Sequence, residues 1–266
     1  MAPRTDLTGK VAVIIGAASD LGLALALSAA DRGMKLALAD ENEDLLAAAL
    51  EQVSAKDVEA IAVLSDMLDV AAFHELAGRS AAELGPPWLV CNNPGVSIEV
   101  TLWGVINGVQ VFAPDVVERD AGHIVNIAAA EVLGTRGAAH DAALTHAIVG
   151  LSESLYRELD SMGSHVGVTS VCPALGNTNI ASALEYRNAG LPSMRDAPPG
   201  FLSPEEVAEQ IFAAVHTRSF WLHPRTAQRA ELSLPGRRAQ HNGRLNQQSD
   251  RRLGVEKRAT HSWRFQ

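Results

Sequence analysis

Short apolar runs alternate with longer stretches of helical periodicity along most of the chain. The apolar runs are typical of buried strands, and they lie at residues 11–16, 35–40, 59–66, 87–92, 122–128, 165–172 and 219–223. The stretches between them predict helices, one ending at residue 32, others over about 41–53, 69–84, 102–118 and 141–162, and a last one from Ser203 onward. Strands that are apolar throughout and separated by helices favour a parallel sheet with helices on both faces. The pattern therefore predicts an α/β fold, a doubly wound Rossmann-type sheet of about seven strands, with its site beyond the carboxyl ends of the strands.

The chain of 266 residues changes composition near residue 235. Residues 1–235 fit a single domain of the predicted fold, and residues 236–266 form a basic C-terminal extension rich in Arg, Gln and Asn. From Trp221 to the end, ten Lys or Arg stand against three Asp or Glu. We expect this extension to be a solvated arm or a strap onto a neighbouring subunit. We expect no nucleic-acid partner, because the whole chain carries a net charge of −9.

Cysteine usage and the apolar stretches bear on where the protein works. Cys91 and Cys172 both lie inside apolar runs and are interpreted as buried free thiols in a reducing compartment. The N-terminal stretch MAPRTDLTGK lacks an apolar signal core, and the stretch LGLALALSAA at 21–30 is too short to cross a bilayer. We therefore expect a cytoplasmic protein without a membrane partner.

The first predicted strand runs into a glycine-containing loop, IGAASDLG at 15–22. Gly16 and Gly22 permit a tight turn and close packing of the next helix, whose N-terminus offers N–H groups to a phosphate. Asp40 ends the second strand, where a carboxylate can bind the two hydroxyl groups of a ribose. The loop and the carboxylate together indicate a dinucleotide site.

Four further stretches add a family resemblance. They are NNPG at 92–95, LWGVINGV at 102–109, GHIVNIAAA at 122–130 and VCPALGNTN at 171–179. With the glycine loop, they resemble the short-chain dehydrogenase/reductase family over roughly residues 8–235. The family pattern is T-G-x-x-x-G-x-G, N-N-A-G, a Ser after the fifth strand, Y-x-x-x-K and P-G-x-x-x-T. The resemblance implies the Rossmann-type fold and a bound nicotinamide cofactor.

The resemblance also assigns positions to the cofactor. The pyrophosphate would be cradled by Gly16, Ser19, Leu21 and Gly22, and the ribose would be bound by Asp40, which would select NAD over NADP. The adenine would be flanked by Asp66 and Met67. The floor of the cofactor site would be lined by Asn92 and Gly95, and the nicotinamide amide would face Thr178. Asp20 replaces a family glycine and Pro94 replaces the family alanine, so we expect the binding of NAD to be weak.

The catalytic positions of the family carry other residues in this chain. The resemblance places Thr101, Ala129, Asp141 and Thr145 where the family has Asn, Ser, Tyr and Lys. No Y-x-x-x-K can be found elsewhere, because Lys is absent between residues 57 and 256. A positioned general acid contributes about 10²–10⁴-fold to a rate. Asp141 is shorter than Tyr by a ring and ionised at neutral pH. The segment 96–101 is also shorter than in the family, which would open the pocket to water.

Other residues at the same predicted helix suggest other chemistries. His140 and His146 stand six positions apart, about 240° around a helix, so we expect no metal site. The stretch GLSES at 150–154 resembles a hydrolase nucleophile motif but falls in mid-helix. His140 with Asp141 could serve as the acid/base pair of a lyase or isomerase, or simply begin the helix.

The leading hypothesis from the sequence is a degenerate member of the family. It would lack ordinary hydride transfer and act as a binding or subunit module. The alternative is an NAD-dependent oxidoreductase for alcohols or ketones with altered catalytic residues, and a second alternative is the lyase or isomerase. The resemblance places the helices 102–118 and 141–162 in a subunit interface, and the first is apolar nearly all round, so we expect a homo-oligomer. Chain from the C-terminal extension could instead cover that face within one subunit.

Overall fold

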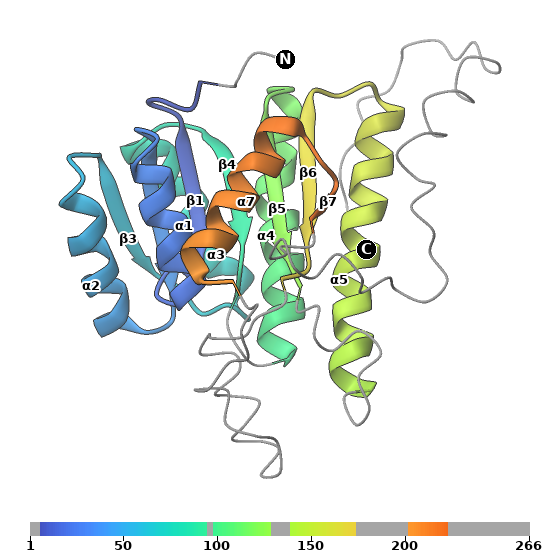
Figure 1. The fold of residues 1–266 in the computed structure, drawn as a ribbon, viewed down its shortest axis with the longest axis horizontal. Coiled ribbons are helices and arrows are strands. Elements are labelled where there is room, and N and C mark those ends of the chain that lie inside the picture. The colour runs from blue at the N-terminus through green and yellow to red at the C-terminus, as the bar shows by residue number, and fades with distance from the viewer. Residues whose placement is uncertain (1–5, 95–97, 129–138, 174–201, 223–266) are drawn as a thin grey trace.

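All seven strands of the sheet run parallel, in the order β3-β2-β1-β4-β5-β6-β7. The structure is a computed structural model and describes residues 6–94, 98–128, 139–173 and 202–222. The strands are β1 (Val11–Ile15), β2 (Lys35–Asp40), β3 (Ala60–Leu64), β4 (Pro87–Asn92), β5 (Gly122–Ile127), β6 (Val166–Val171) and β7 (Trp221–Leu222). The order reverses between β1 and β4, which is the switch point where ligands bind in open parallel sheets (Figure 1).

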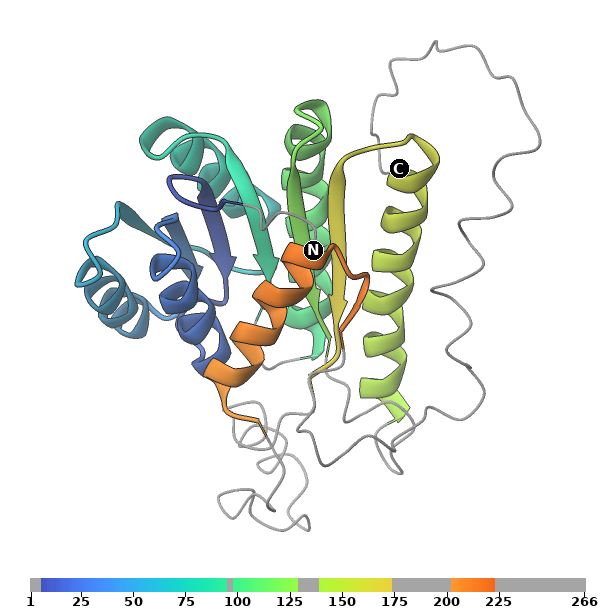
Figure 2. The same ribbon diagram turned by 45° about the horizontal axis from the view of Figure 1, so that its top comes forward.

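Helices cover both faces of the sheet, as the sequence pattern predicts. They are α1 (Asp20–Ala30), α2 (Glu43–Ser54), α3 (Val70–Glu83), α4 (Ile98–Glu118), α5 (Ala139–Ser161) and α7 (Pro204–Thr217). One core cluster joins α1, α2 and α7 to one face, and two clusters join α3, α4 and α5 to the other. Figures 1 and 2 show α1 and α7 side by side on the first of these faces. The doubly wound α/β fold is therefore confirmed.

Alternation along the central strand explains why the strands are apolar throughout. All five residues of β1 are buried. Ala12 and Ile14 belong to the cluster beneath α1 and α7, whereas Val13 and Ile15 belong to the cluster beneath α3 and α4. Both faces of the strand thus contact a helix layer, and every position loses its water.

The helix boundaries differ from prediction mainly at α4. This helix begins at Ile98, four residues before the predicted start, so residues 98–101 of the segment expected to be short form its first turn. The last helix begins as predicted. Ser203 accepts a hydrogen bond from the amide of Glu206, while the Glu206 carboxylate accepts one from the amide of Ser203. This reciprocal pairing satisfies two amides that a helix start leaves unpaired. The C-terminal extension 236–266 lies outside the described residues.

The apolar character of α4 follows from its place in the fold. Residues Val100–Glu118 are long and apolar enough to cross a membrane by length and composition, and half of this stretch is buried. Val105, Val109 and Val116 pack in the cluster that α4 shares with β5 and α5, and Phe112 packs in the cluster on β1 and β4. Packing of this kind accounts for the composition of a core helix.

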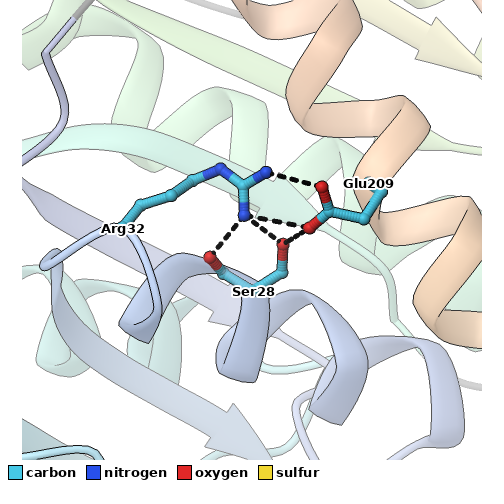
Figure 3. Close-up of polar contacts among 3 residues, drawn as sticks. All are labelled: Ser28, Arg32 and Glu209. Carbon is cyan, nitrogen blue, oxygen red and sulfur yellow. Dashed lines mark hydrogen bonds and ion pairs between the residues drawn. The ribbon is translucent and has the colours of Figure 1, made fainter.

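A polar cluster joins α1 to α7 on the surface. The guanidinium of Arg32 donates to the carbonyl and hydroxyl oxygens of Ser28 and forms an ion pair with Glu209, 2.8 Å between Nη2 and Oε2 (Figure 3). The same guanidinium lies 4.3 Å from the ring centre of Phe212. The cluster fixes the C-terminal end of the helix that begins at the glycine loop.

Candidate functional site

Two glycines allow the loop between β1 and α1 to fold tightly against β4. Gly16 has φ +73°, a conformation that side chains with a Cβ rarely adopt. A Cβ on Gly16 would overlap the carbonyl oxygen of Asn93, and a Cβ on Gly22 would overlap the carbonyl oxygen of Gly16. The backbone therefore turns back on itself with no space for side chains, as a pyrophosphate-binding loop requires.

The start of α1 is organised by Ser19. Its hydroxyl donates to the carbonyl oxygen of Gly16 at 2.8 Å and accepts from the amide of Gly22 at 3.1 Å. The side-chain amide of Asn93 donates to the same hydroxyl at 2.9 Å and to the Gly16 carbonyl oxygen at 3.3 Å. Asn93 thus connects the end of β4 to the glycine loop. Its place as the second Asn of NNPG is the one signal in the sequence that points to it.

Asp40 lies at the carboxyl end of β2, next to the same loop. Its Oδ2 accepts from the amide of Ala18 at 2.9 Å, and its Oδ1 accepts from the amide of Asn42 at 3.1 Å. Each oxygen has a second lone pair, so the carboxylate can still accept from two ribose hydroxyl groups. A 2′-phosphate in the same place would be repelled. The position suits NAD and disfavours NADP.

The two residues expected at the adenine are placed differently from each other. Asp66 is exposed, and its Oδ1 accepts from the amide of Leu68 at 2.8 Å. The side chain of Met67 is 2% exposed and packs in the core, while its carbonyl oxygen accepts from the side-chain amide of Asn107 at 3.1 Å. Met67 could contact an adenine through its backbone alone. Its apolar side chain is buried in the core because α3 and α4 cover it.

Asn92 also departs from its expected place on the cofactor floor. Its side chain is fully buried, and its Nδ2 donates to Oδ1 of Asn126 on the neighbouring strand at 2.7 Å. Gly108 of α4 lies so near that a Cβ there would overlap Oδ1 of Asn92. The side chain therefore lies beneath the floor, because α4 crosses β4 at a glycine. Gly95 and Thr178, the other residues expected near the nicotinamide half, lie outside the described residues.

The family's catalytic positions fall on α4 and α5. Thr101 stands in the first turn of α4 and is partly exposed, and Thr145 is buried on α5. Asp141 lies in the first turn of α5, where the structure describes the backbone only, and Ala129 lies outside the described residues. Positions 141 and 145 are thus on one helix, as predicted, and GLSES falls in the middle of that helix.

His146 points along α5 instead of toward a shared ligand site. Its Nδ1 lies 2.6 Å from the carbonyl oxygen of Ala142, one turn earlier, and its side chain is exposed. In the described segments, no three His, Cys, Asp or Glu side chains lie close enough to hold a metal ion. The side chain of His140 is outside that description, so the expected lack of a metal site stays a prediction.

The parallel sheet, the glycine loop at its switch point and the carboxylate of Asp40 define a dinucleotide-binding α/β protein. The chain matches the short chain dehydrogenase family over residues 10–189 and belongs to that family. The resemblance identified from the motifs is therefore confirmed at the level of the family.

Solved and curated relatives agree with this assignment. A short chain dehydrogenase/reductase from Burkholderia phymatum, solved in complex with NAD, is 34% identical with a TM-score of 0.75, covering 83% of this chain and 90% of that one. The apo form of LigO from Sphingobium is 28% identical with a TM-score of 0.69, covering 83% of each chain. The 1-deoxy-11-beta-hydroxypentalenate dehydrogenase of Streptomyces avermitilis is 30% identical over 81% of this chain and 84% of its own.

The leading hypothesis from the sequence, a degenerate protein without hydride transfer, is wrong. The family match and relatives named as dehydrogenases contradict it and favour the alternative, an oxidoreductase. The hypothesis rested on the side chains at four positions. Those positions define one way of moving a proton, whereas the glycine loop and Asp40 lie together as the resemblance predicts for a cofactor site.

Proposed function

We propose that the protein is an NAD-dependent oxidoreductase that interconverts an alcohol and a ketone with altered catalytic residues. The observation that carries this proposal is the placement of Asp40, held by the amides of Ala18 and Asn42 beside the glycine loop. Each carboxylate oxygen accepts from one backbone amide and keeps a second lone pair, with which the carboxylate can bind the two hydroxyl groups of a ribose. The solved relative in complex with NAD supports the same cofactor.

The described residues fit the adenosine half of NAD. The loop at Gly16 and Gly22 lets a pyrophosphate approach the backbone, and the start of α1 contributes the positive end of a helix dipole. Asp20, the first residue of α1, is exposed and adds a negative charge at that end. Weak binding of NAD is therefore part of the proposal.

The reaction oxidises the alcohol carbon and releases one hydride and one proton. NAD supplies, when bound, the nicotinamide ring that accepts the hydride. The proton must go to a group of the chain or to solvent, and Asp141 occupies the family's proton-transfer position in the first turn of α5. An ionised carboxylate accepts a proton far more readily than it donates one. We therefore propose that Asp141 accepts the alcohol proton as a general base in the oxidation and returns it as a general acid in the reverse reaction.

Assembly and location are proposed from the same resemblance. The outer surface of α4 presents Trp103, which is 53% exposed, and that of α5 presents Ala143, Ala147 and Gly150. A large exposed aromatic side chain on one helix and exposed small residues on another suit close packing of helices from two subunits. We propose a homo-oligomer formed through these faces, in the cytoplasm, with residues 1–235 as one domain.

Binding of NADH by calorimetry tests the cofactor site, with Asp40→Ala as the variant and Asp44→Ala as its control. Asp44 is an exposed acid in the first turn of α2, close in sequence to Asp40. Loss of hydrogen bonds to a charged group costs about 1.5–3 kcal/mol, so Asp40→Ala should weaken NADH by about tenfold or more. Asp44→Ala should bind as the wild type does. Equal binding by both variants, or tighter binding of NADPH than NADH by the wild type, would overturn the assignment.

A further inference from the structure

A chain of buried polar side chains crosses from the sheet to α5 beneath the candidate site. Asn92 donates to Asn126 at 2.7 Å, and Nδ2 of Asn126 donates to the hydroxyl of Ser152 at 3.0 Å. Ser152 in turn donates to the carbonyl oxygen of Ile148, one turn earlier in α5, at 2.7 Å. All three polar side chains are fully buried. We call Asn92, Asn126 and Ser152 the buried relay.

The relay is continuous with the pyrophosphate loop. Asn92 and Asn93 are consecutive, and Asn93 holds Ser19 and the carbonyl of Gly16 through its side chain. The two neighbouring residues thus point opposite ways, one to the glycine loop and the other to α5. A connection of side-chain and backbone bonds therefore runs from the loop for the cofactor phosphates to the helix that carries the family's catalytic positions.

Ser152 also sets which face of α5 looks toward the sheet. Positions 141, 145, 148 and 152 are spaced by four, three and four residues, which places them on one face of a helix. Ile148 and Thr145, the described members of that face besides Ser152, are both buried. A hydrogen bond from Asn126 to Ser152 fixes the rotation and the height of the helix on β5. It adds a directional bond to the apolar contacts that α5 makes through Ile148 and Leu155.

Removing a single polar group from the buried relay is costly. Removing one hydroxyl leaves the amide of Asn126 buried without an acceptor, which costs about 1–3 kcal/mol unless the helix moves to relieve it. The oxygen of Asn92 already lacks a hydrogen-bond donor, because α4 crosses at Gly108. The chain thus retains a polar network in a place where an apolar core would pack without such a penalty.

We propose that Ser152 is a positioning residue that sets where positions 141 and 145 of α5 stand relative to the bound cofactor. The inference rests on the proposed function for its kinetic consequence, but the placement of α5 does not depend on it. Ser152 touches neither cofactor nor substrate. It acts through Asn126 and the rotation of α5.

The test compares Ser152→Ala with Ser154→Ala, the same change on the exposed side of the same helix. Hydrogen exchange is followed by mass spectrometry over residues 142–155, with and without NADH. We expect Ser152→Ala to speed exchange in this segment about tenfold, and to remove the slowing that NADH causes there, while Ser154→Ala matches the wild type. In turnover, Ser152→Ala should lower kcat by about 10- to 100-fold and leave KM for NAD within about threefold.

Each outcome decides one of the two claims. Unchanged exchange in Ser152→Ala, or an equal fall of kcat in both variants, overturns the positioning role. A wild type that neither binds NADH nor turns over contradicts the proposed function, while exchange without the cofactor still decides how α5 is held. Should Ser152→Ala fail to fold, Ser152→Cys replaces the hydroxyl with a thiol, which is only a weak hydrogen-bond acceptor for the amide of Asn126. It is expected to fold and to show the same two effects, and wild-type exchange in it would contradict the proposal.

Discussion

Nε2 of His123 lies 2.7 Å from Oγ1 of Thr169 on the neighbouring strand, deep between the sheet and the end of α7. The Thr169 hydroxyl donates to the carbonyl oxygen of Ser219 at 2.8 Å, so it accepts from the histidine, which is neutral with its proton on Nε2. Burial, followed by the nearby charge of Arg218, lowers the pKa of His123 to about 3. The neutral imidazole of His123 on β5 thus binds Thr169 of β6, and Thr169 in turn binds Ser219, two residues before β7.

The first prediction is that His123 makes the protein less stable in acid. The unfolded chain takes up a proton on this residue below its ordinary pKa of about 6.5, whereas the folded chain does so only near pH 3. The free energy of unfolding should therefore fall as the pH drops through this window, by about 1 kcal/mol between pH 7 and 5.5. Chemical denaturation at the two pH values measures the change. His123→Gln should lose this dependence, and His74→Gln, at an exposed histidine of α3, should keep it.

Below this window a second group acts in the same direction. Hydrogen bonds from His165 and Ser164 lower the pKa of Asp120 to about 2. The folded and unfolded chains differ in the protonation of Asp120 only around and below the ordinary pKa of this carboxylate. Asp120→Asn should therefore not alter how the free energy of unfolding depends on pH between pH 7 and 5.5. An altered dependence in this variant would show that the pair of Asp120 with His165 contributes to it as well.

The second prediction concerns the glycine loop. Gly16→Ala places a Cβ at φ +73° and against the carbonyl oxygen of Asn93, so it should destabilise the fold by about 1–2 kcal/mol and abolish NADH binding. Gly78→Ala is the matched control, since a Cβ on Gly78 in α3 meets open space. It should stabilise the fold by about 0.5–1 kcal/mol and leave NADH binding unchanged. Thermal unfolding and calorimetry report both effects, and normal binding by Gly16→Ala would refute the loop assignment.

The third prediction concerns the negative charge of Asp20 at the start of α1. Asp20→Gly removes both the Cβ and the charge at the start of α1, and Asp20→Asn removes the charge alone. Both should bind NAD more tightly in calorimetry, because the negative charge opposes a pyrophosphate. Both should also lose about 0.3–1 kcal/mol of stability, because an acid at a helix start interacts favourably with the dipole. Unchanged affinity in both would show that Asp20 does not face the pyrophosphate.

The fourth prediction concerns assembly, and burial decides which residue of α4 can test it. Val109 is 3% exposed within one subunit, so a charge there would unfold the chain whether or not it assembles. Trp103→Asp is the better variant, because Trp103 is exposed on α4, with Leu45→Asp on the exposed side of α2 as the control. Light scattering at micromolar concentration should show a dissociated Trp103→Asp and an assembled Leu45→Asp. A monomeric wild type would contradict the interface.

Residues whose place follows from chain order were predictable from the sequence. Asp40 ends a buried strand and Gly16 follows one, so the sheet alone brings them to the same edge. The places of Asn92 and Met67 were not predictable, because a residue at the end of a strand or just past it can face the crevice or a covering helix. Which it faces depends on how closely α4 approaches, and Gly108 and Asn107 decide that by contacts remote in sequence.

The buried relay could not be predicted for the same reason. Asn126 alternates with apolar residues along β5, and Ser152 lies between apolar positions of α5, so each alone resembles an isolated polar residue in a core. Their pairing depends on the rotation of a helix on a strand, which periodicity does not give. The start of α4 at Ile98 also differs from prediction. The segment before it is shorter than in the family, so the family pattern did not indicate at which residue the helix begins.

Formation of NADH from NAD and a panel of secondary alcohols, followed by absorbance, tests the central claim most directly. The wild type should turn over at least one alcohol, with NAD preferred to NADP because of Asp40. Asp141→Asn keeps the size of the side chain but cannot accept a proton, and it should lower kcat by about 100-fold or more while NADH still binds. Failure to form NADH from any alcohol, by wild-type protein that binds NADH, would contradict the account.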